Sequence, residues 1–214
     1  MAQRRAGAER GNDAAALVLE AARILCEEAV VDYRTAKLRA AERLGLRGRA
    51  PLPDNARIQA AMIDYQRLFG GREYAEWLQR LRTTAVQAMR RLAQFEPRLT
   101  GAVVSGAVST AHRAQLHVFV DKPEALDLHL QDLGIPFRQD DRDFRYPDGS
   151  EEQIPLVRFE AGDVGIDVAM FGPEDLRRAP LSPSDGLPMK RLNLAEAEAL
   201  AQVEVEVILG AKGG

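Results

Sequence analysis

The sequence lacks the disulfide cross-links that stabilise many secreted proteins and the long apolar runs that anchor membrane proteins. It contains one cysteine, Cys26, so no disulfide can form within the chain. No apolar stretch of signal-peptide length follows the Met-Ala-Gln-Arg-Arg start, and no run approaches the roughly 20 apolar residues that span a bilayer. These absences predict a cytoplasmic protein with no membrane contact.

Common catalytic signatures are missing as well. The chain has no Cys-x-x-Cys pair, no P-loop and no arrangement typical of a serine triad. Its three histidines, His112, His117 and His129, do not have the spacing of metal ligands. Aromatic residues make up only 6% of the chain and do not alternate with the basic residues, as a surface that stacks bases would require. No enzyme class is therefore evident from a short motif alone.

What the chain does contain is ordinary globular composition with an uneven charge. Hydrophobic residues make up 46% and charged residues 29% of its 214 positions, enough for one large domain or two small ones. Residues 1–100 carry 18 Lys and Arg against 12 Asp and Glu, whereas residues 101–214 carry 11 against 20. The basic half faces either a polyanionic partner or the acidic half of the same molecule.

The first half has helical periodicity. Residues 1–12, rich in Arg, Gly and Ala, predict a disordered tail, and residues 13–96 predict a helical region. Its expected helices span 13–44, 54–69 and 72–95, with glycines at the stops and Pro97 closing the region. One face of the third helix is basic, with Arg80, Arg82, Arg90 and Arg91. The apolar stripe of the long first helix is also compatible with a homodimer.

The second half has the pattern of strands and turns. Residues 97–193 predict a small mixed sheet, and residues 194–214 predict a terminal helix or a closing strand with a tail. The expected strands are 99–104, 115–120, 135–138, 144–146, 154–160 and 164–171, with a helix at 123–133. The acidic run at 140–143 lacks the regular calcium-loop pattern and predicts a solvated loop. The fold class predicted is therefore α+β, an N-terminal helical region followed by a small mixed sheet.

A glycine-rich turn at 101–108 and the strand at 115–120 carry a family resemblance. The turn reads Gly-Ala-Val-Val-Ser-Gly-Ala-Val, and the later hairpin contains Val164-Gly165-Ile166-Asp167-Val168. This arrangement resembles the core of the DNA-polymerase-β-like nucleotidyltransferases. The layout, a helical region before such a core, is also similar to that of uncharacterised bacterial proteins.

The resemblance implies a specific site. In the family, a Gly-Ser or Gly-Gly turn and helix start hold the nucleotide phosphates, while Asp-x-Asp on the next strand and a third carboxylate hold two divalent metals. Gly101 matches the family glycine, Gly106 and Ala107 match the small-residue positions, and Asp167 matches the third carboxylate. Ala102 stands where Ser or Gly is usual, and Arg113 and Gln115 stand where the two aspartates belong.

The missing aspartates leave three functional hypotheses. The first is a degenerate nucleotidyltransferase, a pseudoenzyme that acts as a regulatory module and binds a nucleotide or phosphate near Gly101, Ala102, Gly106, Arg113, Gln115 and His117 without a metal cofactor. Arg113 then either binds phosphate directly or forms a structural ion pair with Asp167. The second is an active nucleotidyltransferase in which Asp167 holds Mg²⁺ or Mn²⁺ together with Asp121 or His117. The third is a protein that binds nucleic acid, or another protein, through the basic helices.

Overall fold

The computed structural model describes residues 2–48 and 50–210, and the chain divides into two compact units. Unit 1 comprises residues 1–74, 107–111 and 183–185, and unit 2 comprises the remainder. The division falls inside the helix Gly71–Arg91, whereas the sequence prediction placed it at Pro97. Residues 75–96 belong to the unit that contains the sheet. Leu81 and Met89, on the buried side of this helix, are part of its core.

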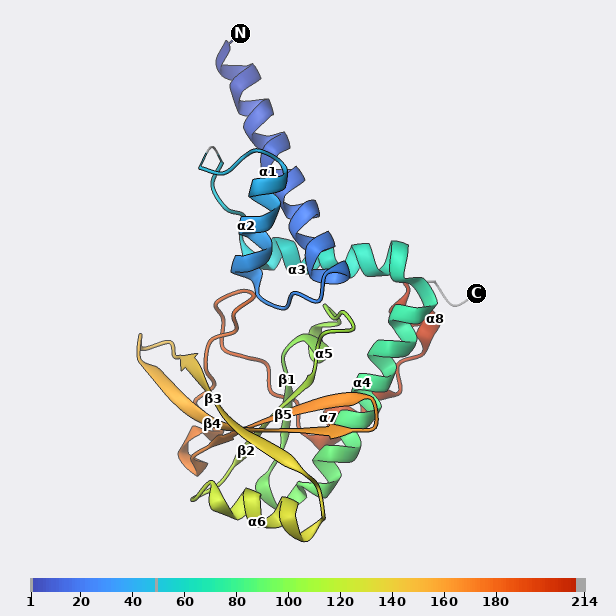
Figure 1. Ribbon diagram of the computed structural model, residues 1–214, viewed down its shortest axis with the longest axis vertical. Helices are drawn as coiled ribbons and strands as arrows, with labels where there is room; N and C mark the ends of the chain where they lie inside the picture. Colours follow the sequence, from blue (N-terminus) through green and yellow to red (C-terminus); the bar gives the residue numbers. More distant parts are fainter. Residues whose placement is uncertain (1, 49, 211–214) are drawn as a thin grey trace. The chain divides into compact units, whose positions relative to one another are not determined.

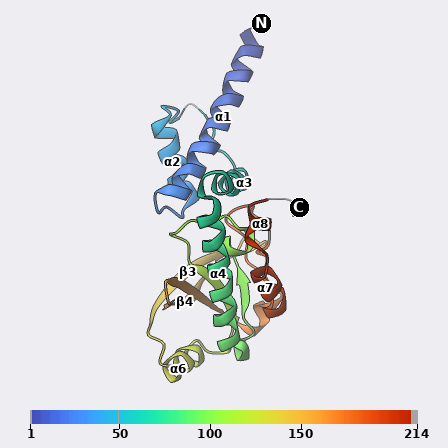
Figure 2. The same cartoon turned by 90° about the vertical axis from the view of Figure 1, so that its right-hand side faces the viewer.

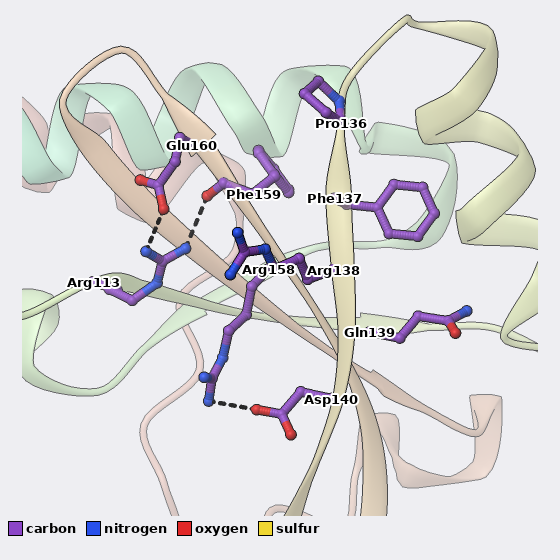
Figure 3. Close-up of a pocket in the computed structure, with 9 residues that line it drawn as sticks. All are labelled: Arg113, Pro136, Phe137, Arg138, Gln139, Asp140, Arg158, Phe159 and Glu160. Carbon is purple, nitrogen blue, oxygen red and sulfur yellow. Dashed lines mark hydrogen bonds and ion pairs between the residues drawn. The ribbon is translucent and has the colours of Figure 1, made fainter.

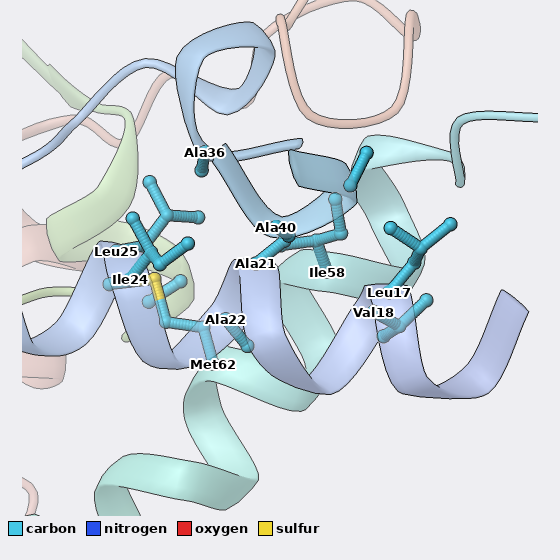
Figure 4. Packing of buried hydrophobic residues seen from close by; sticks show 12 residues of the cluster. Leu17, Val18, Ala21, Ala22, Ile24, Leu25, Ala36, Ala40, Ile58 and Met62 are labelled. Carbon is cyan, nitrogen blue, oxygen red and sulfur yellow. The ribbon is translucent and has the colours of Figure 1, made fainter. Parts of the chain in front are cut away.

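Unit 1 is built from helices around an aliphatic core. Its elements are α1 (Ala2–Glu27), α2 (Tyr33–Arg43), α3 (Asn55–Tyr65) and the π-helical turn η1 (Gln66–Gly70). Leu17, Ile24, Leu25, Ile58 and Met62 are almost completely buried in the core, which is drawn in Figure 4. Apolar side chains recurring three or four positions apart give α1 and α3 this common buried side.

The first helix differs from its prediction at both ends. Helix α1 begins at Ala2, so residues 2–12 are helical and not a tail. It ends at Glu27, whereas the sequence predicted one helix through residue 44. Ala29 has a positive φ of 53°, and the side chain of Asp32 accepts a hydrogen bond from the Thr35 amide at 2.7 Å. This N-cap starts α2 afresh, since an Asp side chain satisfies an amide that a continuous helix would have bonded to its own backbone.

Unit 2 contains a five-stranded mixed sheet in the order β1-β2-β5-β4-β3. The strands are β1 (Arg98–Thr100), β2 (Ala114–Phe119), β3 (Phe137–Arg145), β4 (Glu151–Ala161) and β5 (Val164–Phe171). The helical elements are α4 (Gly71–Arg91), η2 (Ala93–Phe95), α5 (Ala102–Ser105), α6 (Glu124–Asp132), η3 (Pro173–Leu176), α7 (Leu194–Ala201) and α8 (Val205–Ile208). Figure 1 shows these elements, and the predicted α+β fold is confirmed.

The two faces of the sheet differ in chemistry. Side chains alternate between faces along a strand, and the strand register places Leu116, Val157 and Val168 together on an apolar face. The opposite face carries Gln115, Arg158 and Asp167 in one row, because Asp167 is the register partner of both other residues. The central strand β5 is buried along its whole length. Polar groups on the second face are therefore held at fixed positions by the sheet itself.

Ion pairs and hydrogen bonds tie the helices of unit 2 to the sheet and to one another. Figure 2 shows the ribbons of α4, α6 and α7 in this unit. At the β4–β5 turn, Asp163 accepts from Arg80 of α4 at 2.6 Å. Arg90 of α4 pairs with Glu198 of α7 at 2.7 Å. The side chain of His129 on α6 lies 2.9 Å from the carbonyl oxygen of Arg91, at the end of α4. Helices from three parts of the chain are thereby fixed around the sheet.

Two predicted features of the sheet are wrong. The strand expected at 99–104 ends at Thr100, because Gly101 has a φ of 75° and starts the short helix α5. The two short strands and the acidic loop expected between 135 and 146 form one continuous edge strand, β3. Charged residues are stable there because Asp140 pairs with Arg158 and Arg142 pairs with Asp167 on the neighbouring strands.

The C-terminal segment forms two short helices, α7 and α8, and so takes the helical of the two forms predicted for it. The remaining predicted tail at 211–214 lies outside the described residues. Across residues 2–48 and 50–210, no helix is both long and apolar enough to cross a membrane.

Candidate functional site

The polar face of the sheet is centred on Asp167, a carboxylate surrounded by arginines. Its side chain is only 5% exposed. The Oδ1 atom accepts from Nε of Arg113 at 2.6 Å, and Oδ2 accepts from Nη2 of Arg142 at 3.1 Å. Nε of Arg158 lies 3.8 Å from Oδ1. A buried carboxylate of this kind needs compensating positive charge. Arg113 just before β2, Arg142 on β3 and Arg158 on β4 supply it.

Among these arginines, Arg113 makes the most hydrogen bonds. Besides Asp167, its guanidinium donates to Glu160 at 2.6 Å and to the carbonyl oxygens of Phe159 and Ile166 at 2.9 and 3.2 Å. The guanidinium lies over Gly165, where a Cβ atom would collide with it. The ion pair between Arg113 and Asp167, one of two roles that the sequence left open, is therefore present.

The glycine turn lies one strand away from Asp167, with β2 between them. Thr100 pairs with Gln115 across β1 and β2, and Gln115 pairs with Asp167 across β2 and β5. A Cβ atom at Gly101 would meet the side-chain amide of Gln115, so the amide packs directly on the turn. Ala102 begins α5, and Gly106 ends it with a φ of 88°. Gln115 therefore neighbours two other predicted positions, Gly101 on one side and Asp167 on the other.

His117 does not belong to this polar group. The sequence placed it on a polar face, but its side chain is buried, with 2% exposure, against the rings of Phe144 and Phe171. Nε of Arg191 donates to its Nδ1 at 3.0 Å. Burial, together with the charges of Arg191 and Arg142, lowers the pKa of His117 well below its ordinary value. The ring is therefore a neutral acceptor whose Nδ1 lone pair is already used.

Within residues 2–48 and 50–210, the metal ligands that the second hypothesis names do not lie together. Asp121 lies beyond the far end of β2, six positions from Gln115, so about 20 Å of extended strand separates it from the Asp167 row. Nδ1 of His117 is taken by Arg191. The groups around Asp167 are an amide and three cations, whereas Mg²⁺ and Mn²⁺ require several oxygen donors. The described residues therefore do not fit the two-metal site that the resemblance implies.

A cleft of about 610 Å³ opens beside the arginines at the same end of the sheet. Its lining comprises Arg113, Pro136, Phe137, Arg138, Gln139, Asp140, Arg158, Phe159 and Glu160, shown in Figure 3. The volume is within the usual range for small-molecule sites. Three guanidinium groups and two carboxylates line the cleft, which suits it to a compact anion more than to an apolar ligand.

Sequence reasoning missed the arginines of β3 and β4. Arg138 and Arg142 lie on β3 and Arg158 lies on β4, strands whose register no motif revealed. One available signal was Gly165, because a glycine inside a strand often marks the close approach of another group. The predicted basic face of α4, by contrast, is largely used inside unit 2. Arg82 is buried and donates to the carbonyl oxygen of Val103 at 3.2 Å.

Comparisons of the chain with protein-family models, with curated proteins and with solved structures found no match. The function of the site must therefore be argued from its geometry and charge.

Proposed function

We propose that this protein is a nucleotidyltransferase-like module without metal-dependent catalysis, which binds the phosphates of a nucleotide and acts as a regulatory component. The observation that supports it is the ion pair between Arg113 and Asp167, in which a fixed cation contacts the only carboxylate of the expected metal site. A guanidinium there compensates the carboxylate permanently, as a metal would, but it cannot polarise an attacking oxygen.

The charge of the site favours phosphate over metal. A divalent cation near Asp167 would meet three guanidinium groups, of Arg113, Arg142 and Arg158, and would have to displace at least one. A phosphate meets the same groups as donors with planar, forked geometry, which suits bidentate hydrogen bonds to its oxygens. The site therefore selects an anion by charge and by hydrogen-bond direction together.

The two alternative functions gain less from the structure. An active enzyme would need Asp167 to act with Asp121 or His117, and neither lies within reach in a usable state. Nucleic-acid binding by α4 would need free arginines, but Arg80 pairs with Asp163, Arg90 pairs with Glu198 and Arg82 is buried. Both remain hypotheses without a supporting observation.

Thermal melting of the protein with each of the four ribonucleoside triphosphates tests the proposal. A ligand that binds only the folded state raises the melting temperature. We expect at least one triphosphate to do so in EDTA, with no further gain on adding Mg²⁺ or Mn²⁺ in excess. A shift that requires the metal would favour the active enzyme instead, and no shift at millimolar concentration with any triphosphate would overturn the proposal.

A designed variant extends the same test. Arg113→Asp with Gln115→Asp restores the carboxylate pattern of the resembling family, and Gln115 is the register partner of Asp167. Neighbouring carboxylates repel one another, so this variant should melt at a lower temperature than the native protein and recover when Mn²⁺ is added. Arg145→Asp, at the exposed far end of β3, is the matched control and should not respond to Mn²⁺.

A further inference from the structure

Two arginines face each other directly across the β3–β4 ladder. The register pairs Arg138 with Arg158, so both side chains lie on the same face of the sheet. Like charges at directly opposed positions of an antiparallel pair destabilise a sheet. This arrangement therefore costs stability in the free protein unless an anion lies between the two guanidinium groups.

The compensation within the chain is incomplete and weak. Arg158 pairs with Asp140 at 2.9 Å, and Arg113, beside it in the cleft, pairs with Glu160 at 2.6 Å (Figure 3). The two carboxylate side chains are 44% and 62% exposed, and exposed ion pairs contribute only about 0–1 kcal/mol each. Arg138 has no ion-pair partner in the described part of the chain.

We propose that the cleft binds a diphosphate group, with one phosphoryl group on each of Arg138 and Arg158, and that the ligand displaces the carboxylates of Asp140 and Glu160. The diphosphate is either free pyrophosphate or part of a nucleoside di- or triphosphate. This inference rests on the proposed function and specifies its ligand and its recognition. Asp140 and Glu160 act in the free protein as internal competitors of the ligand.

The number of guanidinium groups sets the preference for two phosphoryl groups. Each guanidinium group can donate two parallel hydrogen bonds to one phosphoryl group. A single phosphate would therefore bind one arginine of the pair and leave the other without an anion. Figure 3 shows the ring of Phe137 on the other side of β3 from these arginines. At this end of the sheet a ligand between the two guanidinium groups would meet charge and not the ring of Phe137, so we expect little discrimination among bases.

Isothermal titration calorimetry of the whole protein in EDTA tests the inference, with inorganic phosphate, pyrophosphate, AMP, ADP, ATP and GTP as probes. We expect pyrophosphate and the nucleoside di- and triphosphates to bind at least roughly tenfold more tightly than phosphate or AMP, about the value of one charge-assisted interaction. Equal binding of pyrophosphate and ATP identifies free diphosphate as sufficient, whereas tighter ATP binding identifies a nucleotide. Both results support the diphosphate site, and equal affinity for phosphate and pyrophosphate overturns it.

Variants locate the site and expose the competition. Arg138→Gln and Arg158→Gln should each weaken pyrophosphate binding roughly tenfold, whereas Arg145→Gln on the same strand should leave it unchanged. Asp140→Asn and Glu160→Gln should each tighten binding by roughly threefold to tenfold, because each removes a competing carboxylate. Ligand-free melting of every variant confirms that the fold is retained.

The outcomes separate the two proposals. Nucleotide binding that is unaffected by Arg138→Gln and Arg158→Gln overturns the diphosphate site and leaves the proposed function standing. Absence of binding to both the native protein and the Asp140→Asn/Glu160→Gln double variant overturns both. Binding to the double variant alone supports the internal competition directly.

Discussion

Two buried polar residues lie on the same face of the same sheet, and their surroundings differ completely. Asp167 on β5 contacts Arg113 and Arg142 beside an open cleft. His117 on β2 is enclosed by aromatic rings and Arg191. Its register partner on β5 is Ala169, two positions beyond Asp167. Asp167 carries one negative charge and has three guanidinium groups around it. His117 is a neutral ring that accepts one hydrogen bond, from Arg191.

The difference shows that burial alone does not identify a site. Both side chains are less than 6% exposed, yet of the two only Asp167 is paired with arginines, Arg113 and Arg158, that line the cleft. At the other end of the face, Arg191 lies over the rings of Phe119 and Phe171. That end serves packing, and the open end is available for binding.

The largest expected effect comes from removing the charge of Asp167. Asp167→Asn leaves the surrounding arginines without their buried anion, and we expect it to lower the free energy of unfolding by about 3 kcal/mol. Urea denaturation measures the change. Asp163→Asn, which breaks an exposed pair with Arg80, is the control and should lower stability much less, because solvent screens this pair. Equal losses for the two variants would contradict the distinction drawn between the buried and the exposed pair.

An intermediate effect is expected at the enclosed end. Arg191→Met keeps an unbranched side chain of similar length but removes the donor to Nδ1 of His117. An unsatisfied buried acceptor costs about 1–3 kcal/mol, so urea denaturation should show a loss in that range. Arg177→Met, at an exposed position just after η3, should change stability little. Pyrophosphate affinity should be the same in both variants, and a loss confined to Arg191→Met would extend the binding site to this end.

The smallest effect is a dependence of stability on pH. The folded pKa of His117 lies well below the unfolded value of about 6.5, so only the unfolded state gains a proton as the pH falls from 6.5. The contribution of His117 is complete above pH 6.5 and is lost below it, at up to about 1.4 kcal/mol per pH unit. Burial lowers the pKa of His112 to about 4, which adds a loss of the same sign.

Denaturation between pH 7 and pH 5 measures this slope. His117→Gln should reduce it relative to the native protein, because the carboxylates that titrate at lower pH are the same in both. An unchanged slope would show that His117 binds a proton as readily in the folded state as in the unfolded state, and its assignment as a neutral acceptor would fail.

The sequence predicted the helical elements better than their ends. The apolar periodicity identified α1, α3 and α4, but it could not show that Asp32 caps a new helix, because capping depends on a local backbone turn at Ala29. The hairpin of β4 and β5 was also predictable from its alternation around Gly162. The acidic run on β3 was not, since its charges are stabilised by partners on other strands.

For the candidate site, the order of residues along the chain was enough to identify the glycine turn, Asp167 and the replacement of two expected aspartates by Arg113 and Gln115. The folded structure was needed to show that Arg142 and Arg158 lie beside Asp167, that Arg138 pairs with Arg158 across two strands, and that His117 lies apart from them. The physical reason is strand register, because a shift of one residue turns every side chain of a strand to the opposite face, and register depends on pairing between distant segments.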